Sequence, residues 1–218
     1  MATLKVFSVD GSEVGTYEID TETVADRISK QLLHDAVVMY QANLRQGSHH
    51  ARTRGQVAGS KKKMYRQKGT GNARAGGKRT NVRRGGGVAR TIKSRDYSYR
   101  LNRKALKLAT RMAIRSKIED GEIVVVDKLS FDAPKTSQFA SMLKALGLDS
   151  TSTLVATAEA DRNAYLSGRN IQGVSVQPVR ELNALEVLRP KRMLVTKDAL
   201  DRIKDGSFAE SASEEATA

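Results

Sequence analysis

The residues best able to do chemistry lie in one basic stretch, residues 45–104. It holds 19 Lys or Arg and a single acid, Asp96, a local charge of +18, whereas the rest of the chain has 19 Lys or Arg and 23 acids, a net of −4. Guanidinium and ammonium groups pair with phosphate oxygens, and the ten glycines of the stretch let its backbone approach a ligand closely. The chemistry on offer is therefore the binding of a phosphate polyanion.

The same stretch is too poor in apolar residues to form a core. Its branched aliphatic side chains are Val57, Val82, Val88, Ile92 and Leu101. Such a segment buries too little apolar surface to offset the entropy lost when its chain is ordered. We therefore expect residues 45–104 to form a long extended arm, inserted between two helices, that folds only against a large polyanion.

The cations of this arm are the candidate contacts to RNA phosphates, and the Gln, Asn and Thr side chains among them can reach sugars and base edges. Because the arm is internal, anchored at both ends and varied in sequence, it favours a shaped RNA over general charge neutralisation. The predicted RNA-binding residues are Arg52, Arg54, Lys61, Lys62, Lys63, Arg66, Lys68, Arg74, Lys78, Arg79, Arg83, Arg84 and Arg90.

The composition of the whole chain narrows the classes of protein to which it can belong. With 218 residues, a net charge of +14 and a pI near 10.1, the chain favours a nucleic-acid partner. It has no long apolar run, and Lys5 and Asp10 interrupt the short one at the N-terminus, so we expect neither a membrane partner nor a signal peptide. Zero cysteines exclude disulfides and zinc ribbons, and the absence of Trp argues against base-stacking platforms.

The elements predicted before the arm connect its N-terminal end to the globular body. Residues 3–19 alternate like a hairpin that turns at Asp10 and Gly11. Apolar residues at spacings of three and four then predict one long helix over residues 22–44, capped by Thr21 or Thr23, with Gly47 as its stop.

The elements after the arm alternate between helix and strand. A helix capped by Asn102 is predicted over residues 103–119; its cations, from Arg103 to Lys117, either form a solvated face or extend the RNA-binding surface. Strands are predicted at residues 122–127, 152–158, 174–179 and 193–196, with helices between and after them at 136–147, 161–168, 181–188 and 197–204. The first of these helices is expected to be capped by Thr136 or Ser137 and the second by Asp161.

This alternation predicts an α/β fold, with a mostly parallel sheet and helices on both faces. The expected divisions are residues 1–44 and 105–206 for the globular body, 45–104 for the arm, and 207–218 for an acidic, disordered tail.

Short motifs that resemble cofactor sites fail on their spacing. Gly69-Thr70-Gly71 begins like a dinucleotide loop, but Arg74 stands where the third glycine belongs. Gly76-Gly77-Lys78 resembles a phosphate loop, but Asn72 and Arg79 replace two required residues. We therefore expect no cofactor.

Metal and catalytic sites are also not expected. His49 and His50 lie in a loop without further ligands. Asp127, Asp132 and Asp161 follow predicted strands, where carboxylates can be catalytic, but a helix cap and surface charge explain them more simply. We predict no catalytic residue and no metal.

The run KKKMYRQKGTGNAR at residues 61–74 resembles the arm of a known family, the universal fourth protein of the large ribosomal subunit in its bacterial form. The nearly fixed piece of that arm, an aromatic residue, RQKGTG, a variable residue and AR, stands here from Tyr65 to Arg74. The pattern of arginine, glycines and valine at residues 84–88 and the stretches at 102–104 and 132–136 are also similar. Met64 and Tyr65 stand where relatives often have Pro-Trp.

The resemblance implies a structural, non-enzymatic component of the large ribosomal subunit in the cytoplasm. In the family the body binds large-subunit rRNA, and the arm lines part of the peptide exit tunnel and supports subunit assembly. The implied partners are large-subunit rRNA, neighbouring large-subunit proteins and the nascent peptide. The residues that match the tip lining the tunnel are Arg66, Gln67, Lys68, Gly69, Thr70, Gly71 and Arg74.

Two other functions remain alternatives. An RNA-modifying enzyme would need a Gly-rich loop after a strand, or clustered carboxylates, to hold its cofactor or metal. A general polyanion-binding protein would bind DNA and RNA equally at matched salt.

Overall fold

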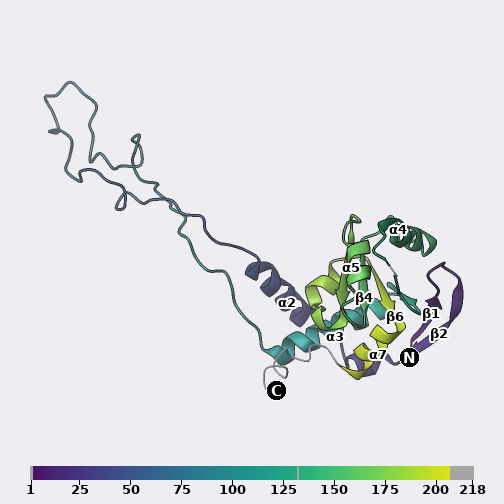
Figure 1. Cartoon of the computed structure of the whole chain (residues 1–218). Coiled ribbons are helices and arrows are strands. Elements are labelled where there is room, and N and C mark those ends of the chain that lie inside the picture. The colour runs from purple at the N-terminus through teal and green to yellow at the C-terminus, as the bar shows by residue number, and fades with distance from the viewer. Residues whose placement is uncertain (1, 132, 207–218) are drawn as a thin grey trace, which may run out of the picture. The chain divides into compact units, whose positions relative to one another are not determined.

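The computed structural model describes residues 2–131 and 133–206, and Figure 1 shows its trace. The chain divides into two units. The first, called the body below, consists of Met1–Tyr40 and Arg100–Ala218. The second, called the basic unit, is Gln41–Tyr99 and contains most of the predicted arm.

The body is built on a six-stranded sheet in the order β2-β1-β3-β6-β4-β5. Only β1 and β2 pair antiparallel; the other four pairs are parallel, so the predicted mostly parallel sheet is confirmed. The strands are β1 Ala2–Phe7, β2 Glu13–Ile19, β3 Ile123–Val126, β4 Thr153–Thr157, β5 Val174–Pro178 and β6 Arg192–Thr196.

Helices cover both faces of this sheet, as predicted. Along β4, Leu154 and Ala156 pack into one buried cluster with residues of α3, α6 and α7, while Val155 packs into another with Phe139 of α4. Successive side chains of a strand point to opposite faces, so the clusters lie on the two sides of the sheet. The helices are α1 Thr21–Val24, α2 Lys30–Asn43, α3 Arg103–Glu119, α4 Thr136–Ala145, α5 Arg162–Gly168, α6 Ala184–Leu188 and α7 Lys197–Asp205, with a 3-10 turn, η1, at Val179–Glu181.

The long helix predicted over residues 22–44 is interrupted, so that prediction was wrong. After α1, Ala25 has an extended backbone, and α2 begins five residues further on at Lys30. The guanidinium of Arg115 on α3 donates to the carbonyl oxygens of Ala25 at 2.5 Å and Asp26 at 2.7 Å. These bonds satisfy acceptors that the break releases. The apolar spacing of the sequence runs through the break and gives no sign of this contact.

The predicted caps of two helices are confirmed. The side chain of Asn102 accepts a hydrogen bond from the backbone N–H of Lys104 at 3.1 Å, at the start of α3. The side chain of Asp161 accepts one from Asn163 at 2.9 Å, at the start of α5. Both use a short polar side chain to satisfy an N–H that the first helical turn leaves unpaired.

The predicted caps of two other helices were wrong by one or more positions. Asp20, and not a threonine, accepts from the N–H of Glu22 at the start of α1. Lys135 precedes α4 and makes no capping bond, because Thr136 and Ser137 already lie inside the helix.

One cation of α3 is buried, contrary to the prediction that the charged residues of this helix cover its outer side. The side chain of Lys117 is 8% exposed, and its ammonium group bonds to the carboxylate of Glu122. It also donates to the carbonyl oxygens of Pro190 at 2.9 Å and Lys191 at 3.2 Å. A buried charge needs such partners, so Lys117 ties α3 to the start of β6.

Two predictions concern residues outside the described part of the chain, the acidic tail at 207–218 and Asp132. Among the described residues, no helix has the length and apolar character required to cross a bilayer.

Candidate nucleic-acid interface

The basic unit is a loop of two limbs held by polar contacts. Along the chain between α2 and α3, where every residue is described, the structure contains no helix or strand and one isolated bridge, between Thr53 and Val88 (Figure 1). Main-chain hydrogen bonds cross between the limbs, from the N–H of Ala51 to Ile92 at 2.9 Å and from that of Val88 to Arg52 at 3.0 Å. The limbs therefore pair without forming a sheet.

Most of the predicted RNA-binding cations lie on the surface of this unit. No Asp or Glu occurs between Arg52 and Arg90 in the sequence, so no carboxylate of this stretch neutralises them. Arg79 and Arg83 are half-buried. The exposed ones are Arg52, Arg54, Lys61, Lys62, Lys63, Arg66, Lys68, Arg74, Lys78, Arg84 and Arg90.

The predicted tip residues, apart from Arg74, which directly follows it, lie in one small closed loop. The phenol of Tyr65 donates to the carbonyl oxygen of Ala73 at 2.5 Å, which closes the loop across its base. Within it, the guanidinium of Arg66 donates to the carbonyl of Gly69 at 3.1 Å. Gly69 and Gly71 have φ angles of +79° and +71°, which glycine adopts without strain. The structure thus gathers these residues around a turn that the hydrogen bond from the Tyr65 hydroxyl to Ala73 closes. The sequence did not predict this bond.

Arg79 was predicted as a phosphate contact, and the structure turns its side chain inward. Its Nε donates to the carbonyl oxygen of Gly59, and its Nη1 donates to those of Gly55 at 3.2 Å and Arg54 at 3.5 Å. In the sequence it is one arginine among many, and nothing distinguishes it.

The sequence also did not predict a contact where the two limbs begin and end. This part of the basic unit, called the root below, comprises Arg45, Gly47, Arg95 and Tyr97. The ring of Tyr97 lies between two guanidinium groups, with the Cζ of Arg45 at 3.9 Å and that of Arg95 at 4.3 Å from its centroid. Cation–π contacts of this kind stabilise by about 0.5–1 kcal/mol at exposed sites. The hydrogen bond from Arg95 and the charges of both arginines lower the pKa of Tyr97.

Gly47 makes this root possible. Its φ is +64°, and a Cβ added there would strike the carbonyl of Arg95 and the ring of Tyr97. The N–H of Arg95 donates to the carbonyl of Gly47 at 3.2 Å. The sequence predicted Gly47 as a helix stop, but α2 ends at Asn43 and the glycine instead allows the two limbs to approach.

The one acid of the basic unit is engaged locally. The carboxylate of Asp96 accepts hydrogen bonds from the N–H of Ser98 at 2.8 Å and from its hydroxyl at 2.7 Å. The bond from the backbone of Ser98 lowers the pKa of Asp96. This carboxylate therefore stays ionised and closes a short turn beside Tyr97.

The basic helix α3 divides its cations between internal and external roles. Arg115 and Lys117 bond within the body, as described above. Lys104 and Lys107 are exposed and line a cavity of about 470 Å³ with Arg111. The exposed part of the helix thus remains available to an anionic partner.

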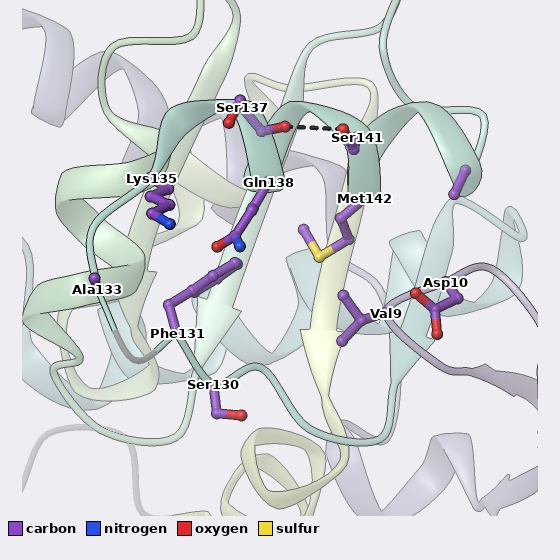
Figure 2. A pocket seen from close by; sticks show the side chains of 11 residues that line it. Val9, Asp10, Ser130, Phe131, Ala133, Lys135, Ser137, Gln138, Ser141 and Met142 are labelled. Carbon is purple, nitrogen blue, oxygen red and sulfur yellow. Dashed lines mark hydrogen bonds between the residues drawn. The ribbon is translucent and has the colours of Figure 1, made fainter.

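The body contains a cavity where an enzyme of this fold class would place its site. It measures about 660 Å³ and lies where β1 and β3 end, against α4 (Figure 2). Ligands of open α/β sheets bind at the carboxyl ends of strands. Its described lining has the hydroxyls of Ser130, Ser137 and Ser141, one carboxylate, Asp10, one amine, Lys135, and no histidine. Among the described residues this set offers no paired carboxylates, and the amine of Lys135 makes no hydrogen bond to a serine hydroxyl that it could activate as a nucleophile.

Metal-ligating residues are scattered in the part of the chain that the structure describes. No group of three or more His, Cys, Asp or Glu gathers there in a way that could hold an ion. His49 and His50 are exposed in the basic unit, and Asp161 serves as a helix cap.

Comparison with known proteins finds one family along nearly the whole chain. The profile of the family described as ribosomal protein L4/L1 matches residues 17–206. A large ribosomal subunit protein uL4 from Rhodopirellula baltica is 71% identical over 209 residues, which cover 96% of this chain and 94% of that protein. Proteins of the same name from Clostridium botulinum and Symbiobacterium thermophilum are 40% and 38% identical, each over 94% of this chain and 98% and 99% of their own length.

Proposed function

This chain belongs to the ribosomal protein L4/L1 family, and on that premise we propose that it binds large-subunit rRNA through its basic unit. The family is one of ribosomal proteins, which confirms the resemblance seen in the sequence and the prediction that the chain is not an enzyme. Membership makes the chain a structural constituent of the large ribosomal subunit in the cytoplasm.

The observation that carries the proposal is the charge of residues 52–90. Thirteen Lys and Arg and no acid fall in this stretch, and all but Arg79 and Arg83 are exposed. Each cation that contacts a phosphate releases counterions, which gives RNA binding its affinity and its dependence on salt. The glycines between the cations let the backbone approach the RNA where a side chain would prevent it.

The finer part of the proposal concerns the closed loop between Tyr65 and Ala73. The residues that match the family's tunnel tip, Arg66 to Arg74, are gathered in and beside this loop. We assign the loop to the wall of the peptide exit tunnel, where it would contact the nascent peptide, and the rest of the unit to rRNA and to neighbouring large-subunit proteins. By bridging phosphates of RNA helices that lie close together, the unit would support assembly of the subunit.

Sedimentation tests this proposal. Tagged protein in a gentle cell lysate is run through a sucrose gradient and washed at a salt concentration that strips loosely bound basic proteins. We expect it to migrate with the large subunit and its precursors after the wash, with ultraviolet crosslinks from residues 52–90 to large-subunit rRNA. Migration at the top of the gradient, or equal competition by DNA and RNA at matched salt, would instead support a general polyanion-binding protein.

A further inference from the structure

A concave site lies inside the basic unit, between two segments that are distant in the sequence. Four residues of the first limb and three of the second line a cavity of about 440 Å³: Arg54, Gly55, Ser60, Lys61, Gly77, Arg79 and Thr80. The cavity, called the cup below, falls within the range of roughly 300–1,000 Å³ typical of small-ligand sites. It is therefore large enough for a part of an RNA strand, and it lies entirely within one unit of the chain.

Arg79 holds the two walls of the cup together. Its guanidinium lies across the first limb and donates to the carbonyl oxygens of Gly59 and Gly55, the latter at 3.2 Å. Bonds from a charged donor are about twice as strong as neutral ones. Only the planar guanidinium reaches separate acceptors from one fixed fork, so lysine at this position would keep the charge but lose the brace.

The second wall is held by hydrogen bonds within the second limb. The hydroxyl of Thr80 donates a hydrogen bond to the carbonyl oxygen of Gly77 at 2.8 Å. The N–H of Gly87 donates one to the carbonyl oxygen of Arg79 at 3.1 Å. A Cβ on Gly87 would strike the main chain of Arg54, and one on Gly86 would strike the carbonyl of Thr80. Glycine at these positions therefore lets the chain pack closely enough to form the second wall of the cup.

The groups that line the cup suit a nucleotide. Arg54 and Lys61 are exposed and, among the described residues, have no side-chain hydrogen bond or ion pair. Ser60 and Thr80 bring two hydroxyls to the same lining, which has no carboxylate. Cations bind the phosphate of a nucleotide, hydroxyls bind its ribose, and a guanidinium plane such as that of Arg79 offers a stacking surface to an unstacked base.

We propose that the cup takes up one unstacked nucleotide of the RNA that the basic unit contacts. Arg54 and Lys61 hold its phosphate, Thr80 contacts its ribose, and Arg79 is a positioning residue that keeps the walls in place. This inference rests on the proposed binding of rRNA and adds to it a defined site for a single nucleotide.

The chain has no cysteine, so one introduced thiol reports on the cup. In Ser60→Cys the thiol replaces a hydroxyl that lines the cup; in the control Ser48→Cys it replaces an exposed serine outside the lining. The full-length variants are alkylated with iodoacetamide, free and with a transcript of bacterial large-subunit rRNA at ten times the Kd. We expect RNA to slow alkylation of Ser60→Cys about tenfold, since the site is then free roughly one-tenth of the time, and that of Ser48→Cys by less than about threefold.

The role of Arg79 is tested in the Ser60→Cys background. Arg79→Lys should reduce the protection to less than about threefold at saturating RNA, because the charge remains but the fork is lost. Arg162→Lys is the matched control, since Arg162 is an exposed arginine of the body outside the predicted RNA-binding residues, and it should leave the protection unchanged.

The outcomes separate this inference from the proposed function. If the RNA binds and the thiol at position 60 reacts as fast as in the free protein, the cup is empty and the inference is wrong, while the proposed function stands. If Arg79→Lys keeps full protection, Arg79 is not the brace. If the unmodified chain does not bind the transcript, the proposed function itself fails.

Discussion

The body and the basic unit are stabilised by different kinds of contact. In the body, side chains such as Ile114, Phe139 and Leu154 are fully buried in clusters on both faces of the sheet. In the basic unit, Val82 and Ile92 are 87% and 61% exposed, and main-chain bonds, one arginine fork and one tyrosine between two arginines hold the limbs. Polar contacts in water each contribute only about 1 kcal/mol, so the order of the basic unit should depend on its partner.

The two regions also use their cations differently. In the body, Arg202 pairs with Glu159 at 2.5 Å, and Lys117 and Arg115 bond to acceptors of neighbouring elements. Between Arg52 and Arg90 there is no carboxylate with which to pair. The same residue types therefore stabilise the fold in the body, whereas in the basic unit most of them, apart from Arg79 and the two arginines at Tyr97, remain available to an anionic partner.

The largest expected effect comes from removing the basic stretch. Because Ala51 bonds to Ile92, a short Gly-Ser linker can replace Arg52 to Arg90 without straining the ends. If about half of the 13 removed cations contact phosphates, at roughly 0.7–0.9 each, the slope of log K against log salt should fall by about 5. Filter binding to a large-subunit rRNA transcript over a range of KCl concentrations measures this slope.

The same deletion should leave the body folded, since its buried clusters lie in Met1–Tyr40 and Arg100–Ala218. Circular dichroism during heating checks this expectation. A variant that unfolds would show that the two regions share their stability, which would break the contrast between them. A variant that keeps its RNA affinity would place the RNA contacts on the body.

A matched pair of isoleucine substitutions compares the two regions directly. Ile114→Ala removes a fully buried side chain from α3 and should lower the free energy of unfolding by about 2–5 kcal/mol. Ile92→Ala removes a mostly exposed side chain from the basic unit and should change it by less than about 0.5 kcal/mol. Urea unfolding followed by circular dichroism measures both. Equal losses would mean that the basic unit has a core after all.

The body could be predicted from the sequence because its signals are local. Alternating strands and helices gave the mostly parallel sheet, and Asn102 and Asp161 marked two helix starts correctly. The break after α1 could not be predicted, because it depends on a guanidinium ninety positions away on α3. The burial of Lys117 could not be predicted either, because the hydrogen-bond acceptors of its ammonium group are supplied by Glu122 and by the segment before β6.

The composition of the sequence marks the basic stretch, but it does not predict the contacts that its residues make. Charge counts and glycine content marked this stretch and predicted an RNA partner for it, and the run from Tyr65 to Arg74 gave the family, which the comparisons confirm. Neither signal says which cations turn inward. Arg79 and Arg83 look alike in the sequence, and only the carbonyl groups brought close by folding give Arg79 its role. The RNA-binding residues themselves stay a prediction.

The pKa values of two tyrosines, Tyr17 in the body and Tyr97 in the basic unit, shift in opposite directions. In the body, burial and the hydrogen bond from the phenol to Asp201, at 2.6 Å, raise the pKa of Tyr17 to about 12. Its unfolded value is near 10, so the contribution of this bond to stability is complete below about pH 10 and is lost as the pH rises through about 12. In the basic unit, Arg95 and then Arg45 lower the pKa of Tyr97, so its contribution is present above about pH 10 and is lost as the pH falls through the folded value.

The order of ionisation therefore distinguishes the regions, since Tyr97 has cations beside it and Tyr17 a carboxylate. Phenolate absorbance during alkaline titration, compared between the unchanged chain and Tyr17→Phe or Tyr97→Phe, assigns each transition. We expect Tyr97→Phe to remove an early transition and Tyr17→Phe a late one. Tyr17→Phe should also cost about 1 kcal/mol of stability at neutral pH and nothing above the folded pKa. If Tyr97 ionises with Tyr17 or after it, the arginines do not flank its ring in solution, and the root of the basic unit is open in the free protein.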